Sequence, residues 1–111
     1  MTRQQQKALH LYFKLIAEQF REIGMPFRYH LEILNKYIEL PHTGNIVKEF
    51  VWRPIQLALF DIKSTKDITT QQVNEIVNVM NVYFGEKGYD IQFPSIESFM
   101  FKMDKQKYNG K

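Results

Sequence analysis

The sequence contains no cysteine, and this absence excludes several kinds of site at once. Without thiols the chain can form no disulfide, no thiolate nucleophile and no metal centre that depends on cysteine ligands. A cysteine-free chain is also compatible with a reducing compartment, so we expect a cytoplasmic protein.

Long apolar runs are missing as well. The N-terminal segment, residues 1–20, is interrupted by Lys14 and Glu18, so it fits neither a signal peptide nor a membrane span. We therefore expect no membrane partner.

The usual motifs of catalysis and metal binding are also absent. His10, His30 and His42 lie far apart and form no paired-histidine metal motif, and no Gly-rich phosphate loop, nucleophile elbow or dinucleotide fingerprint occurs. Asp61 and Asp67 flank a loop and could form the paired carboxylates of a nuclease, but helix capping and loop solvation explain them more simply. We predict that the protein is not an enzyme and uses no metal or cofactor.

What is present indicates one globular domain. The 111 residues are 44% hydrophobic and 24% charged, which suits a single folded unit. The formal net charge of +3 permits an anionic partner such as nucleic acid, although clustered charge is the stronger sign. We expect a domain over residues 1–103 and a basic, flexible tail over 104–111.

Apolar residues recur at helical spacing in two long segments. The first segment stops at Gly24 and Pro26, and its apolar positions are Leu9, Tyr12, Phe13, Ile16, Phe20 and Ile23. The second stops near Gly85 and Gly88, and its apolar positions are Val73, Ile76, Val77, Met80, Tyr83 and Phe84.

The region between these helices is less regular. A weaker helical pattern is formed by Phe27, Leu31, Leu34 and Ile38, and the segment before Pro41 is expected to be extended. Thr43 or Asn45 could cap a helix over residues 46–52. At Pro54 that helix either kinks or gives way to a second helix over residues 55–60.

After Gly88 the pattern changes again. Residues 89–93 alternate apolar and polar side chains, which indicates a short strand or extended segment, and Ser95 could cap a last helix through Met103. The predicted fold is therefore mainly α, with about four helices and at most one or two short extended segments.

Basic residues form one stripe on the first helix. At about 100° per residue the stripe lies opposite the apolar face, and its members are Arg3, Lys7, His10, Lys14 and Arg21. Such a ridge could follow a phosphate backbone, or it could be an ordinary solvated face.

Two further segments carry candidate binding residues. Trp52 beside Arg53 could stack on a DNA base, or Trp52 could pack in the core while Arg53 pairs with Glu49. The segment Lys63-Ser64-Thr65-Lys66 precedes a capping box formed by Thr69 and Gln72, so it is not needed to cap the helix. We predict that this segment, KSTK, contacts phosphate.

The second long helix is apolar beyond its main stripe. Val79 and Val82 lie outside that stripe, beside a neutral ridge of Asn74, Asn78 and Asn81. A helix with such a wide apolar surface is central in the fold or lies at a subunit contact, so a homodimer is plausible.

Three stretches together resemble a known family. TRQQQKALHLYFKLIAEQFREIG (2–24), VKEFVWRP (47–54) and KSTKDITTQQVNEIVNVMNVYFGEKGYDIQFPS (63–95) are similar, in order and spacing, to the lambda NinB/Orf family of phage recombination mediators. The resemblance covers roughly residues 1–95. It implies a dimer that binds single-stranded DNA and single-strand-binding protein and helps to load a recombinase, in the cytoplasm of the phage host. The matching positions are Gln5, Lys48, Trp52, Ser64 and Thr65.

The main functional prediction is therefore a phage-type recombination or replication accessory protein that binds single-stranded DNA, single-strand-binding protein or both. The alternative is a small protein-interaction factor that inhibits or redirects a host enzyme or defence system. Its affinity would come from an aromatic patch at Trp52, Tyr12 or Phe99–Phe101 and would depend little on salt.

Overall fold

The computed structural model describes residues 2–109, and the side chains of residues 2–103. It is mainly helical with one small antiparallel sheet, which confirms the predicted fold class. Along the chain the elements are α1 (Arg3–Glu22), β1 (Phe27–Leu31), the 3₁₀ turn η1 (Glu32–Leu34), β2 (Lys36–Leu40), α2 (Gly44–Ile46), the π-helical segment η2 (Val47–Trp52), α3 (Arg53–Phe60), the 3₁₀ turn η3 (Thr65–Asp67), α4 (Thr70–Glu86) and α5 (Ile96–Asn109).

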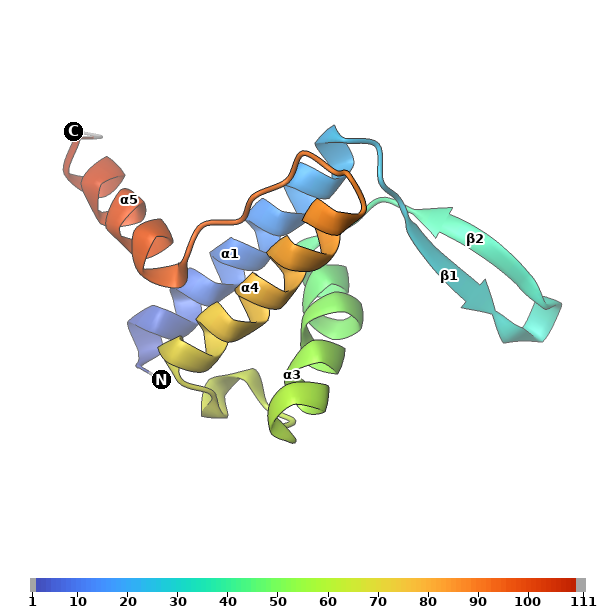
Figure 1. The fold of residues 1–111 in the computed structure, drawn as a ribbon, viewed down its shortest axis with the longest axis horizontal. Coiled ribbons are helices and arrows are strands. Elements are labelled where there is room, and N and C mark those ends of the chain that lie inside the picture. The colour runs from blue at the N-terminus through green and yellow to red at the C-terminus, as the bar shows by residue number, and fades with distance from the viewer. Residues whose placement is uncertain (1, 110–111) are drawn as a thin grey trace.

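The two long helices form the centre of the molecule. α1 and α4 overlap in the middle of Figure 1 and meet through their side chains, since the rings of Phe20 and Phe84 lie 5.3 Å apart between centroids; the chain returns between α4 and α5. Their facing apolar stripes are buried together with Trp52, with Ile91 and Phe93 of the return segment (residues 87–95), and with Ile96 at the start of α5. Burial of these apolar side chains is the main stabilising contribution to the fold.

Both long helices begin and end as their residues indicate. Thr2 and Gln5 form a capping box on α1, and Thr69 and Gln72 form the predicted one on α4. Gly24 and Gly88 follow the helices with φ of +72° and +83°, the left-handed conformation that glycine adopts without strain.

Residues 27–40 form a β-hairpin, so the helix expected from Phe27, Leu31 and Ile38 is wrong. The strands pair Phe27 with Leu40 and Tyr29 with Ile38. A spacing of four residues also satisfies the strand period of two, so the pattern fitted both structures. The turn is completed by Asn35 in the left-handed region, at φ 48°.

From Gly44 to Phe60 the helix is continuous, although its hydrogen-bond pattern changes in η2. Thr43 caps it, with its hydroxyl accepting from the Ile46 amide. The amide of Arg53 donates to the carbonyl of Lys48, five residues earlier, and Pro54 occupies the first turn of α3. Of the two predicted outcomes at Pro54, the structure has a second α-helical segment, which starts at Arg53 with the proline in its first turn and follows the π-helical segment directly.

The return segment is extended but belongs to no sheet. The side chain of Asn81 replaces a strand partner, because its Nδ2 donates to the Phe93 carbonyl (3.0 Å) and its Oδ1 accepts from the Phe93 amide (2.8 Å). Asn74 does the same at the start of α5, where its Oδ1 accepts from the Ile96 amide (2.9 Å). Two members of the predicted neutral ridge therefore hold the return segment in place.

The last helix, expected to end at Met103, continues to Asn109.

Candidate functional site

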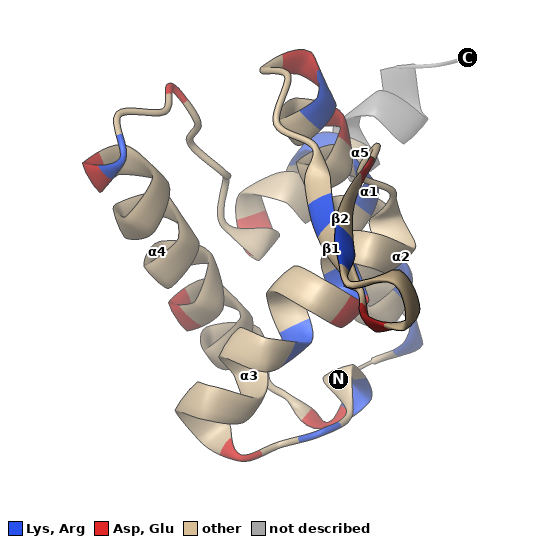
Figure 2. Cartoon of the chain, turned by 90° about the vertical axis from the view of Figure 1, so that its right-hand side faces the viewer, with Lys and Arg blue, Asp and Glu red and all other residues tan. Residues whose placement is uncertain are grey.

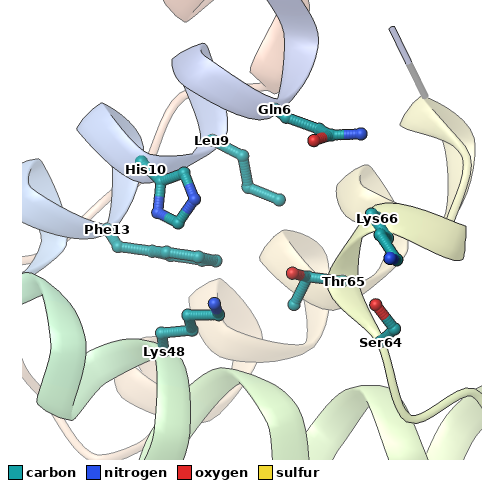
Figure 3. Close-up of a pocket in the computed structure, with 8 residues that line it drawn as sticks. All are labelled: Gln6, Leu9, His10, Phe13, Lys48, Ser64, Thr65 and Lys66. Carbon is teal, nitrogen blue, oxygen red and sulfur yellow. The ribbon is translucent and has the colours of Figure 1, made fainter. Parts of the chain in front are cut away.

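A pocket of about 250 Å³ lies between α1, η2 and the η3 turn. Figure 3 shows the side chains of α1 on one side, the η3 turn opposite, and Lys48 from η2 on a third side. The residues that line it are Gln6, Leu9, His10, Phe13, Lys48, Ser64, Thr65 and Lys66. Four of them, Lys48, Ser64, Thr65 and Lys66, are among the predicted binding residues.

The α1 wall follows from helical geometry. Residues 6, 9, 10 and 13 share one face of a helix because they lie three, four and seven positions apart. Phe13 is buried, and the exposed ring of His10 meets it edge-on at 6.3 Å between centroids. Gln5, a predicted DNA contact, has its side chain engaged in the cap, where its Oε1 accepts from the Thr2 amide at 2.8 Å.

The opposite wall is held by α3. The buried side chain of Gln56 donates to the Ile62 carbonyl (2.8 Å), and Nε of Arg53 donates to the Lys63 carbonyl (3.2 Å). Ile68 is buried immediately after the turn. The η3 turn is thus anchored on both sides, so Ser64 and Thr65 are held facing α1 without any ligand.

The third side is provided by Lys48, which is half-buried in η2. π-helical turns inside α-helices are rare and occur frequently at functional sites. Here the π turn includes the residue whose ammonium group enters the pocket (Figure 3).

The charged side chains that line the pocket are basic, namely Lys48 and Lys66. None of the residues that line it is acidic. In the part of the chain whose side chains are described, Lys48, Ser64, Thr65 and Lys66 make no side-chain hydrogen bond or ion pair, and the Arg53–Glu49 pair (2.8 Å) is the sole salt bridge. Ammonium and hydroxyl groups together are typical ligands of phosphate oxygens. The arrangement therefore suits an anion.

Trp52 and Arg53 are core and anchoring residues, as the packing interpretation predicts. Trp52 is fully buried and packs edge-on against Phe13 at 5.0 Å between ring centroids. Its ring cannot stack on a base, which corrects that candidate. The guanidinium group of Arg53 donates hydrogen bonds to the Glu49 carboxylate and to the Lys63 carbonyl.

The remaining basic candidates lie outside the pocket. Arg3, Lys7 and Lys14 are exposed along α1, and Arg21 donates to the His42 carbonyl near the hairpin. Lysines and arginines lie on α1, the hairpin and the segments around the pocket, whereas α4 contains none between Thr70 and Glu86 (Figure 2). Lys63 is exposed and does not line the pocket. The structure thus brings Ser64, Thr65 and Lys66 together with Lys48, and the basic stripe continues along α1.

Sequence reasoning missed one surface altogether. The hairpin extends away from the helices (Figure 1), and its turn exposes Ile33 by 87% and Leu34 by 63%. Phe50 of η2 is 51% exposed and touches the rings of Phe27 and Tyr29 at 4.9 and 6.2 Å between centroids. The alternation of Phe27, Tyr29 and Leu31 with polar residues was the sequence signal that could have indicated this strand.

The aromatic patch predicted at Trp52 and Tyr12 is buried, although Phe101 is 68% exposed.

Comparisons with protein-family models, with curated proteins and with solved structures found no match. The resemblance to the NinB/Orf family therefore stays a prediction, as does the homodimer. Within residues 2–109 no helix is long and apolar enough to cross a membrane. Among the side chains of residues 2–103 there is no cluster of three or more histidine, aspartate or glutamate residues that could hold a metal ion.

Proposed function

We propose that the protein is a non-enzymatic accessory protein that binds single-stranded DNA through a phosphate group held in this pocket. The observation that carries the proposal is a pocket lined by no carboxylate and by four donors that form no hydrogen bond or ion pair with the side chains of residues 2–103: Lys48, Ser64, Thr65 and Lys66. Lys48, Ser64 and Thr65 are half-buried and Lys66 is exposed, so an acceptor-rich ligand can reach all four donors.

A single strand suits the site better than a duplex. The pocket is a small recess, and a flexible strand can turn one phosphate into it, whereas the backbone of a duplex is held on a regular helix. The exposed Arg3, Lys7 and Lys14 would neutralise neighbouring phosphates along α1. The role in recombination or replication, and the contact with single-strand-binding protein, come from the family resemblance and complete the proposal.

Fluorescence anisotropy with a labelled oligothymidine at several salt concentrations tests this function. We expect log K to fall with log salt at roughly −0.7 per phosphate contact. Lys48→Gln should weaken binding, and Lys36→Gln on the remote hairpin is the matched control. If the wild-type protein binds no oligonucleotide at low salt, the proposal is refuted.

A second candidate function is supported by the hairpin. Exposed apolar residues on a protruding element are typical of a protein-interaction surface, which fits a factor that redirects a host enzyme or defence system. Pull-down from nuclease-treated host lysate should recover a partner with the wild-type protein and lose it with the double variant Ile33→Ser and Leu34→Ser. Val82→Ser on α4, where the valine is 51% exposed, is the control for general loss of apolar surface.

A further inference from the structure

The shape and charge of the pocket distinguish between the phosphates of a DNA strand. An internal phosphodiester carries one negative charge, and the strand must both enter and leave its binding site. A terminal phosphate is a monoester that carries about −1.5 to −2 at neutral pH and offers three terminal oxygens. The strand leaves such a group in one direction only.

The pocket has the charge that a monoester needs. Lys48 and Lys66 supply two positive charges, and no carboxylate among the lining residues offsets them. The hydroxyls of Ser64 and Thr65 add two neutral donors on the wall next to Lys66. Two ammonium groups and two hydroxyls match a dianion with three terminal oxygens better than a phosphodiester with two.

The pocket is also small and bounded on three sides. It is walled by α1, by η2 and by the η3 turn, and Leu9 and Phe13 form its apolar surface on the α1 side (Figure 3). Its volume of about 250 Å³ is below the roughly 300–1,000 Å³ of sites that enclose a whole small molecule. A phosphate with part of its sugar fits this space, and the rest of the strand remains outside.

We infer that the pocket recognises a strand end, by binding the terminal phosphate monoester of single-stranded DNA. This inference rests on the proposed function. The anchoring of the chain just before the η3 turn by Gln56 and Arg53 means that the backbone carrying Ser64 and Thr65 is in place before the phosphate arrives. Such preorganisation favours the compact, doubly charged group over a flexible internal phosphate.

Competition between strand ends tests the inference. Oligothymidines of one length, with a 5′-phosphate, a 3′-phosphate or two hydroxyl ends, are compared by anisotropy, with the label on the end that is not varied. We expect one phosphorylated end to bind about tenfold more tightly than the hydroxyl form, and the two phosphorylated arms show which end is recognised. Equal affinity for all three oligonucleotides would overturn the inference and leave DNA binding intact, whereas no binding by any of them would overturn both.

Variants locate the effect. Lys48→Gln and Thr65→Val should each reduce the preference for the phosphorylated end, and Lys36→Gln should preserve it. A preference that survives both pocket substitutions would place the phosphate elsewhere and refute the inference. Titration of the ¹⁵N-labelled wild-type protein with inorganic phosphate needs no variant to fold. It should shift the amide signals of residues 64–66 first, and shifts confined to other segments would contradict the assignment.

Discussion

Replacing Asn81 by alanine should destabilise the protein more than its half-buried position on α4 suggests. The substitution removes both hydrogen bonds to Phe93, and each contributes about 0.5–1.5 kcal/mol net. Phe93 is 2% exposed, so water cannot readily replace the lost partner of its amide and carbonyl. Alanine's better helix propensity offsets at most about 0.7 kcal/mol. The net loss in free energy of unfolding is on the order of 2 kcal/mol.

Asn78 provides the matched control, because it lies one turn earlier on the same helix. It is exposed, and within the described side chains its amide makes no hydrogen bond. Asn78→Ala should leave stability unchanged or raise it by at most about 0.7 kcal/mol. Urea denaturation followed by circular dichroism measures both free energies of unfolding. In thermal denaturation, Asn81→Ala should lower Tm by on the order of 8 °C. If the two variants are equally stable, the side chain of Asn81 does not replace a strand partner.

Three other changes test separate parts of the structure. Burial, and then the charge of Arg21, lower the pKa of His42 below its ordinary value of 6.5. The unfolded chain therefore binds the proton of this histidine more readily than the folded protein does. The free energy of unfolding should fall as the pH drops below about 6.5. His42→Gln should flatten that part of the pH profile of urea midpoints, and an unchanged slope would exclude His42 as its cause. Thr69→Ala removes the acceptor of the α4 capping box and should lower the free energy of unfolding by about 1 kcal/mol, whereas Thr70→Ala, one residue later, should not. Arg53→Ala removes no group that lines the pocket, but it removes the donor that binds the Lys63 carbonyl, so it should weaken DNA binding. Unaltered affinity would show that the η3 turn keeps its conformation without this hydrogen bond.

The helical part of this fold was predictable because each signal is local. Val73 to Phe84 repeat at helical spacing, and Thr69 and Gln72 mark the start of the helix three residues apart, so neighbouring residues carry the information. The hairpin was not predictable in this way, since the spacing of Phe27 and Leu31 satisfies a helix and a strand equally. Its correct register depends on the pairing of Tyr29 with Ile38 across a turn.

The candidate site was predictable in its parts and not in its assembly. KSTK stood out because the capping box left Lys63 to Lys66 without a structural role, and this argument still holds for the pocket. That Lys48 would lie in one pocket with Thr65 depends on how η2 packs against α1, which no local pattern encodes. Trp52 shows the converse, because an aromatic residue beside a guanidinium looks the same in sequence whether it faces a base or the core.

The hairpin has a consequence for the kinetics of the native state. Nearly every residue from Arg28 to Pro41 is exposed, and an isolated pair of strands is at best marginally stable in water. Its amide protons should therefore exchange with solvent through frequent local opening, while those of α1 and α4 wait for unfolding of the whole domain. A partner that binds Ile33 and Leu34 would slow this exchange selectively, so the hairpin would report its own occupancy before any ligand is identified.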